Sequence, residues 1–216
     1  SPYLAGWIYA LGIAWDAVTD PFMGYLAERT SSPRGRYRPY ILFGTIPLAL
    51  SFVLLFWVPP LEGISLFLCL VVINVFHRTC FTIVSVPYSS LTPRITSDSE
   101  ERTKLTTARM IGASFGTLLM SSLGFPIINF FGQNDESLGI IYLSFISASI
   151  AVVILYFTYW SVKESSTEEI KETYPSVSKL ISSILINYPF WIVFSSILIL
   201  GSTTIMFNKN LIYYIK

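Results

Sequence analysis

Charge is scarce in this chain of 216 residues. Asp, Glu, Lys and Arg together make up 12% of the sequence, whereas soluble domains carry about 25%. Hydrophobic residues reach 53%, and the mean hydropathy is +0.61. The formal net charge is +1, so the overall field indicates no nucleic acid partner. This balance argues against a soluble globular domain and indicates a chain that meets lipid.

Groups that carry enzyme chemistry are also few. The sequence has one histidine, His77, and two cysteines, Cys69 and Cys80. The cysteines fall in one apolar segment, and about 16 Å of helical rise between them is too far for a disulfide. The sequence has no HExxH or GxSxG motif and no His/Cys cluster with metal-ligand spacing. A membrane-embedded enzyme and a resident cofactor are therefore not expected.

Long runs without charge dominate what is present. A helix needs about 20 mainly apolar residues to cross a bilayer. We predict an all-α, polytopic membrane helical bundle with about six transmembrane helices. These helices are predicted over residues 2–27, 40–59, 64–91, 106–131, 138–161 and 182–213.

Lys and Arg gather in alternate connections between these helices. Connections 28–39, 92–109 and 163–181 are basic, whereas 59–63 and 132–137 contain no Lys or Arg. Because Lys and Arg are enriched in cytoplasmic loops, the three basic connections are predicted to face the cytoplasm. The first residue then lies outside, and a chain that enters a helix from that side without a leader is expected to be cut at both ends.

Two carboxylates interrupt the first apolar helix. Asp16 and Asp20 are four positions apart and share one helix face. A charged side chain at mid-membrane costs about 3 kcal/mol on insertion scales, and two like charges also repel each other. A cation between them or protonation relieves both costs. Thr19 adds a hydroxyl, and Pro21 frees a backbone carbonyl, so the group suits Na⁺ or H⁺. The alternative is that both aspartates pair with arginines as structural braces.

Further polar residues lie in or beside the third and fourth predicted helices. Arg78 is predicted to face the interior and to meet an anionic group or one of the aspartates, with a snorkelling arginine as the alternative. His77 is interpreted as a satisfied interior histidine rather than a proton relay. Arg109 either lies at the interface or contacts substrate. Thr82 and Tyr88 either line a sugar pathway or serve packing.

The first basic connection is predicted to form a cytoplasmic latch. Its arginines would pair with nearby acids and hold one transport state closed, with a purely topological role as the alternative. The arginines are Arg34, Arg36 and Arg38, and the acids are Glu28, Asp98, Glu100 and Glu101.

Several strings resemble one family. Residues 15–24, WDAVTDPFMG, are similar to the second-helix motif of the glycoside–pentoside–hexuronide:cation symporters of the major facilitator superfamily. Residues 30–42, TSSPRGRYRPYIL, resemble that family's first cytoplasmic loop. Residues 82–93, TIVSVPYSSLTP, resemble its fourth helix, and Ala108 with Arg109 resembles the start of its fifth.

The resemblance implies that the chain holds the second to seventh of the twelve helices of a major-facilitator fold. Residues 1–162 would then form the N-terminal transporter half without its first helix. Residues 163–181 would be the cytoplasmic linker between halves, and residues 182–216 the first helix of the C-terminal half.

The resemblance also implies roles for individual residues. Asp16, Asp20, Thr19 and Thr82 match cation-site positions, and the two aspartates would be the metal ligands if the ion is Na⁺. Arg109 matches an arginine that contacts the sugar, whereas Ser85 and Ser89 replace the family's aspartate and aromatic residue. With Arg78 and Tyr88, which the residues themselves suggest, these positions form the predicted substrate-binding set.

Taken with the resemblance, the sequence predicts a cation-coupled secondary symporter for sugars or glycosides. It would work by alternating access in a cell membrane, a bacterial inner membrane by expectation, as a multi-pass protein and a monomer when complete. Its partners would be a small sugar, the co-transported Na⁺ or H⁺ and membrane lipid. The alternatives are a major-facilitator transporter of another cargo, such as a lysolipid, and a non-transporting membrane sensor.

Overall fold

A computed structural model describes residues 2–96, 98–133, 135–162, 164, 182–183 and 185–214. This described part of the chain contains long helices and no strands. The helices are α1 (Pro2–Arg29), α2 (Arg38–Leu55), α3 (Gly63–Ile95), α4 (Ser99–Gly132), α5 (Glu136–Ser161) and α7 (Tyr188–Tyr214). Each corresponds to one of the predicted spans, so the all-α prediction is confirmed.

Several helix ends differ from their predicted positions by a few residues, and two of these differences have clear local reasons. Helix α4 begins at Ser99 rather than 106, because the Asp98 carboxylate accepts the backbone N–H of Glu100 and caps the helix. Helix α2 ends at Leu55 rather than 59, shortly before Pro59 and Pro60. The polar residues 99–105, which lie before the predicted start of this helix, are thus part of α4.

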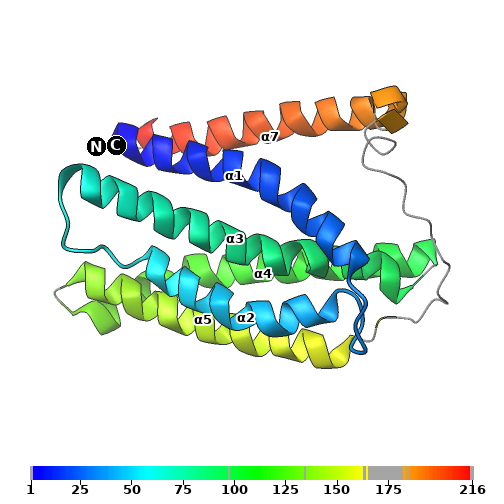
Figure 1. The fold of residues 1–216 in the computed structure, drawn as a ribbon. Helices are drawn as coiled ribbons and strands as arrows, with labels where there is room; N and C mark the ends of the chain where they lie inside the picture. Colours follow the sequence, from blue (N-terminus) through cyan, green and yellow to red (C-terminus); the bar gives the residue numbers. More distant parts are fainter. Residues whose placement is uncertain are drawn as a thin grey trace. The chain divides into compact units, whose positions relative to one another are not determined.

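The chain divides into two compact units, residues 1–166 and 167–216. The first unit contains α1 to α5, and each of these helices runs antiparallel to the one before it (Figure 1). The second unit contains α7, whose residues Tyr188–Thr204 form a shorter apolar stretch. Most of the predicted linker, 163–181, lies outside the described residues, and only Glu164 belongs to the described part.

Helix α3 lies at the centre of the first unit. It packs against α1 on one side and α2 on the other, while α5 packs against both α2 and α4. A cluster of buried side chains joins α1, α2 and α3 at one end of the unit. Its members are Met23, Ala27, Tyr37, Ile41 and Leu91.

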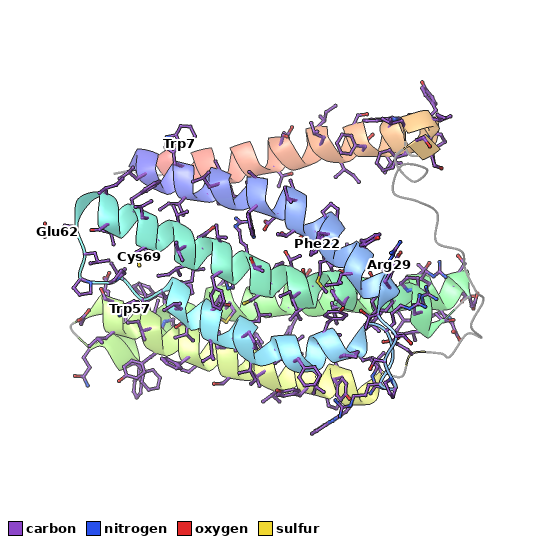
Figure 2. The ribbon with its side chains drawn as sticks, in the orientation of Figure 1. Trp7, Phe22, Arg29, Trp57, Glu62 and Cys69 are labelled. Atoms are coloured by element: carbon purple, nitrogen blue, oxygen red, sulfur yellow. The ribbon has the colours of Figure 1, made fainter. Side chains whose placement is uncertain are left out.

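The ends of the first unit differ in charge. Figure 2 shows Trp57 and Glu62 at one end and Arg29 at the opposite end. The Arg29 end also carries the start of α2 at Arg38, so the first two basic connections lie together there. This arrangement agrees with the predicted alternation of basic and non-basic ends.

The surface of the first unit is apolar along much of its length. Helices α2 to α5 are each long and apolar enough to cross a membrane. Large side chains such as Phe125 and Phe157 are more than two-thirds exposed, as expected for groups that face lipid rather than water. Helix α1 falls outside this set of four, since it carries Asp16 and Asp20 in its middle.

Candidate functional site

The α1–α3 seam, defined here by Asp16, Asp20, Arg78 and Thr82, joins two helices through polar side chains. Arg78 of α3 forms an ion pair with Asp16 of α1, through its Nη1 and the Asp16 Oδ2. The side chains of Arg78 and Asp16 are 20% and 30% exposed. Of the partners that the sequence left open for Arg78, the structure brings it to one of the aspartates. Arg78 is therefore the counter-charge of Asp16 in this structure.

Asp20 has a different kind of partner. The Thr82 hydroxyl of α3 donates a hydrogen bond of 2.7 Å to the Asp20 Oδ1. Thr82 is buried, at 2% exposure, whereas Asp20 lies on the exposed side of the seam. The partner of Asp20 is thus a neutral hydroxyl, whereas the partner of Asp16 is a guanidinium.

The seam has a further hydrogen bond that the sequence reasoning missed. The indole N–H of Trp15 donates to the Thr79 hydroxyl at 2.9 Å, and that hydroxyl donates to the Val75 carbonyl at 2.8 Å. Trp15 and Thr79 each neighbour a member of the Asp16–Arg78 pair in sequence. The bond therefore fixes the register of α1 against α3 at the level of that ion pair.

Two small features hold the Arg78 side chain in place. Its Nε donates to the Asn74 Oδ1 at 3.2 Å, and its guanidinium carbon lies 5.6 Å from the centre of the Tyr9 ring. A methyl group added at Gly12 would lie 2.2 Å from the Arg78 Nε, so only glycine leaves room for the arginine there. Both features follow helical spacing: Asn74 precedes Arg78 by four positions, and Gly12 precedes Asp16 by four.

The other predicted cation ligands lie on α1 itself. The Thr19 hydroxyl donates to the Trp15 carbonyl at 3.1 Å, so its oxygen is turned toward its own helix in this conformation. Pro21 lies inside α1, and its missing N–H leaves the Ala17 carbonyl without its usual donor. Among the residues that the structure describes, no group of three or more His, Cys, Asp or Glu gathers, so the oxygen set here is two carboxylates, hydroxyls and a carbonyl.

Three of the predicted substrate residues lie together between α3 and α4. The Arg109 Nη2 donates to the Ser89 hydroxyl at 3.2 Å. The Arg109 guanidinium carbon lies 4.9 Å from the centre of the Tyr88 ring. Ser85 lies one helical turn before Ser89 and is half-buried. This group presents a guanidinium, two hydroxyls and an aromatic face.

His77 is a satisfied interior residue, as its sequence context indicated. Its Nδ1 lies 3.1 Å from the Ser51 hydroxyl of α2, and its ring packs near Phe52 with centroids 5.9 Å apart. These contacts face α2, away from the α1–α3 seam.

A second carboxylate site, the Glu164 clamp, lies at the basic end of the first unit. Glu164 follows α5 and accepts backbone N–H groups from the start of α2. Its Oε2 accepts the N–H of Arg36 at 2.6 Å, and its Oε1 accepts those of Tyr37 and Arg38 at 2.8 and 2.9 Å. The first N–H groups of a helix have no partner within it, and a carboxylate at this position is stabilised by the helix dipole.

Gly35 leaves the space that the Glu164 carboxylate occupies. The φ angle of Gly35 is +104°, a backbone conformation that favours glycine. A methyl group built on Gly35 would lie 2.7 Å from the Glu164 Oε1. Arg38 adds a neighbouring link to α5, because its Nη2 donates to the Tyr159 carbonyl at 2.7 Å and its guanidinium carbon lies 4.6 Å from the Tyr159 ring centre.

The predicted latch has other partners in this conformation. Arg36 and Arg38 order the loop through Glu164 and Tyr159, and the Arg34 guanidinium carbon lies 6.0 Å from the Phe43 ring centre. On the other connection, Glu100 pairs with Lys104 at 2.8 Å and Glu101 accepts the Thr96 hydroxyl at 2.6 Å.

The remaining acids of the predicted latch are Asp98 and Glu28. Asp98 caps α4, and Glu28 lies on the exposed surface of α1. Arg36 meets Glu164 through its backbone N–H and not through its guanidinium, so the latch stays a prediction for another transport state. The signal for Glu164 was present in the sequence as an acid directly after a predicted helix.

Comparisons with known proteins agree on one family. Residues 1–216 match the family described as MFS/sugar transport protein. The chain is 29% identical over 213 residues to the putative glycoside/cation symporter YagG of Escherichia coli K12, covering 99% of this chain and 46% of that protein. It is 28% identical over 204 residues to the isoprimeverose transporter of Lactiplantibacillus pentosus, covering 89% of this chain and 43% of that protein.

A vertebrate relative carries a different cargo in its name. The chain is 40% identical over 131 residues to the sodium-dependent lysophosphatidylcholine symporter 1-A of Danio rerio, covering 59% of this chain and 24% of that protein. All three relatives are named as symporters or transporters. The chain spans less than half the length of these curated relatives.

Proposed function

Because this chain belongs to the MFS/sugar transport protein family, of the major facilitator superfamily, we propose that the protein is a secondary symporter that couples Na⁺ or H⁺ to a sugar or glycoside. The chain is a multi-pass, all-α membrane protein of that family. Its named relatives include a glycoside/cation symporter and an isoprimeverose transporter, which supports the cargo class.

The proposal rests on the position of Asp20 within a membrane helix and on its hydrogen-bond partner. A carboxylate within a membrane helix costs about 3 kcal/mol on insertion scales, and such residues commonly mark ion pathways. Asp20 is oriented by the Thr82 hydroxyl at 2.7 Å and is not neutralised by it. A Na⁺ ion or a proton supplies the missing charge, and hard cations prefer oxygen ligands of this kind. We therefore assign the coupling cation to Asp20 and Thr82, with Asp16 and Thr19 close by.

The cargo is assigned to the group at Arg109. Arg109, Ser89 and Tyr88 lie together, and Ser85 precedes Ser89 by one turn. Hydroxyl and guanidinium donors suit the hydroxyls of a sugar, and an aromatic face suits its C–H surface. Both this group and the α1–α3 seam involve α3, so cation and cargo sites share a helix.

Transport would proceed by alternating access. The two halves of the complete transporter would rock about a site near the midplane, with residues 163–181 as the cytoplasmic linker and the basic end of the first unit facing the cytoplasm. Cation binding at Asp20 favours the state that binds sugar, and sugar raises the affinity for the cation by the same factor, because such coupling is reciprocal.

Uptake into proteoliposomes tests the proposal. The protein expressed from its complete gene is reconstituted, and accumulation of labelled glycosides is compared under an inward Na⁺ gradient, an inward H⁺ gradient and no gradient. We expect one gradient to drive accumulation in the wild type and Asp16→Asn or Asp20→Asn to abolish that drive. Gradient-driven accumulation that survives in both variants would refute the cation assignment.

A lysolipid is the second candidate cargo. The zebrafish lysophosphatidylcholine symporter is 40% identical over 131 residues, which makes a lysolipid the cargo to test beside a sugar. The same vesicles are therefore also supplied with labelled lysophosphatidylcholine. Cation-driven movement of the lysolipid with no glycoside uptake would replace the sugar assignment and retain the cation site. No driven movement of either cargo would favour a non-transporting sensor.

A further inference from the structure

The two aspartates of the α1–α3 seam are not equivalent. Asp16 is paired with the guanidinium of Arg78, whereas Asp20, among the described residues, accepts a hydrogen bond only from the neutral hydroxyl of Thr82. Two carboxylates and one guanidinium leave the cluster with a net charge of −1. One monovalent cation neutralises this cluster, and a second cation would have to displace Arg78 from Asp16.

Arg78 is held where it can be released. Its links to Asn74 and Tyr9 keep the guanidinium beside α1, and the space above Gly12 admits it. The pair remains partly open, since Arg78 and Asp16 are 20% and 30% exposed. A fully enclosed pair would admit no ion, whereas this pair is not fully covered by the first unit and leaves both charges open to an approaching cation.

We infer that Arg78 is a positioning residue of the cation site, a tethered counter-ion that occupies Asp16 until the coupling cation displaces it. This inference rests on the proposed function. In the cation-free state Arg78 keeps the two carboxylates from repelling each other. When a cation binds beside Asp20, Asp16 can leave Arg78 and become a second ligand. Arg78 thereby sets the apparent cation affinity by competition.

The direction in which one substitution changes the cation affinity distinguishes this role from a structural one. Arg78→Gln removes the competing positive charge and should lower the cation concentration at half saturation by about tenfold or more, since a nearby like charge opposes binding. If Arg78 only braces α1 against α3, the same substitution loosens the site and weakens cation binding. Arg78→Lys keeps the charge and should bind the cation with an affinity close to that of the wild type.

Binding is measured on the complete protein in detergent. Calorimetric titration with NaCl, against choline chloride, reports Na⁺, and a pH-indicator dye reports H⁺ uptake. Arg94→Gln is the matched control, because Arg94 lies in the last turn of the same helix, away from the seam. Asn74→Ala is the second variant: it keeps the charge of Arg78 but loosens its tether, and should tighten cation binding about twofold.

The outcomes separate the inference from the proposed function. If the wild type binds neither Na⁺ nor H⁺, the proposed function fails and the inference fails with it. If the wild type binds a cation and Arg78→Gln binds it with equal or lower affinity, only the inference is overturned. Should Arg78→Gln not fold, weaker cation binding by Asn74→Ala overturns it instead.

Discussion

Carboxylates hold the first unit together in two places, and they do so in opposite ways. In the α1–α3 seam, Asp16 and Asp20 are held by side chains, a guanidinium and a hydroxyl. In the clamp, Glu164 is held by three backbone N–H groups at the start of α2. Side-chain partners can rotate away or exchange with an ion. Backbone N–H groups at the start of a helix are held in place by the helix and do not rotate away.

This difference indicates which carboxylates can change partners during transport. A ligand shifts an equilibrium only through contacts that differ between two states, and the seam offers such contacts. The Glu164 clamp instead fixes the end of α5 to the start of α2 and so gives the seam a rigid frame. Function and stability should therefore respond separately to substitutions in the two places.

The largest effect is expected at Asp20. Asp20→Asn keeps an oxygen that can accept the Thr82 hydroxyl but removes the charge that attracts the cation. Accumulation driven by the cation gradient should fall by about 100-fold, near the upper end of common coupling factors, with thermal unfolding unchanged. Glu164→Gln is the comparison, and it should keep the capacity for driven uptake per folded molecule. Equal loss of driven uptake in both would remove the distinction between the two regions.

The next effect is expected at Gly35. Gly35→Ala places a methyl group against the Glu164 carboxylate in a backbone region that disfavours side chains, and should destabilise the protein by about 3 kcal/mol. Gly63→Ala is the matched control, since Gly63 has a φ of +61° with open space around it. That control carries the backbone cost alone, about 1 kcal/mol. Thermal unfolding in detergent compares them, and equal losses would show that the contact with Glu164 contributes nothing.

A smaller effect is expected from the clamp charge itself. Glu164→Gln retains one acceptor oxygen, so at least one of the three hydrogen bonds to the backbone is lost and the others become neutral, and neutral bonds are about half as strong as charged ones. We expect a loss of about 2 kcal/mol in unfolding free energy. Glu62→Gln is the control, because Glu62 precedes α3 without a side-chain capping bond. If both variants unfold at the same temperature, the clamp does not stabilise the fold.

The smallest effect is expected within the seam, at Thr79. Thr79→Val removes the acceptor of the Trp15 indole N–H at nearly constant volume, and should cost about 1 kcal/mol with cation-driven uptake retained. Thr117→Val serves as the control, because the Thr117 hydroxyl donates within its own helix, to the Ala113 carbonyl at 2.9 Å. A complete loss of driven uptake in Thr79→Val would instead place Trp15 and Thr79 within the cation site.

The helices were readable from the sequence because their signal is local and long. Uncharged runs predicted every described helix longer than a few residues, and errors fell at the ends, as at Ser99 and Leu55. These ends are set by the Asp98 cap and by the prolines that follow α2, beginning with Pro59. Both signals extend over only a few residues, where hydropathy carries little information. The resemblance named Thr82 and Asp20 as positions of one cation site, but it did not predict the hydrogen bond between them.

The partners of the charged residues were harder to predict. The apolar run around Arg78 predicted that it lies inside a helix and faces a negatively charged partner. That partner could have been Asp16, Asp20 or an unknown anion. Opposite charges in neighbouring loops suggested a latch, and in this structure Arg38 and Glu100 instead contact Tyr159 and Lys104. Pairing between residues far apart in sequence depends on the rotation and register of whole helices, which no single segment encodes.

The sequence by itself determined that the chain is a set of membrane helices, which ends are basic, and that Asp16 and Asp20 share a face within the first helix. These features follow from hydropathy, charge and helical period, all of which are local. Only the tertiary structure decided that Arg78 pairs with Asp16, that Thr82 donates to Asp20, and that Glu164 is bound by the start of α2. Those assignments depend on which face α3 turns toward α1, and on the short distances over which charges and hydrogen bonds choose their partners.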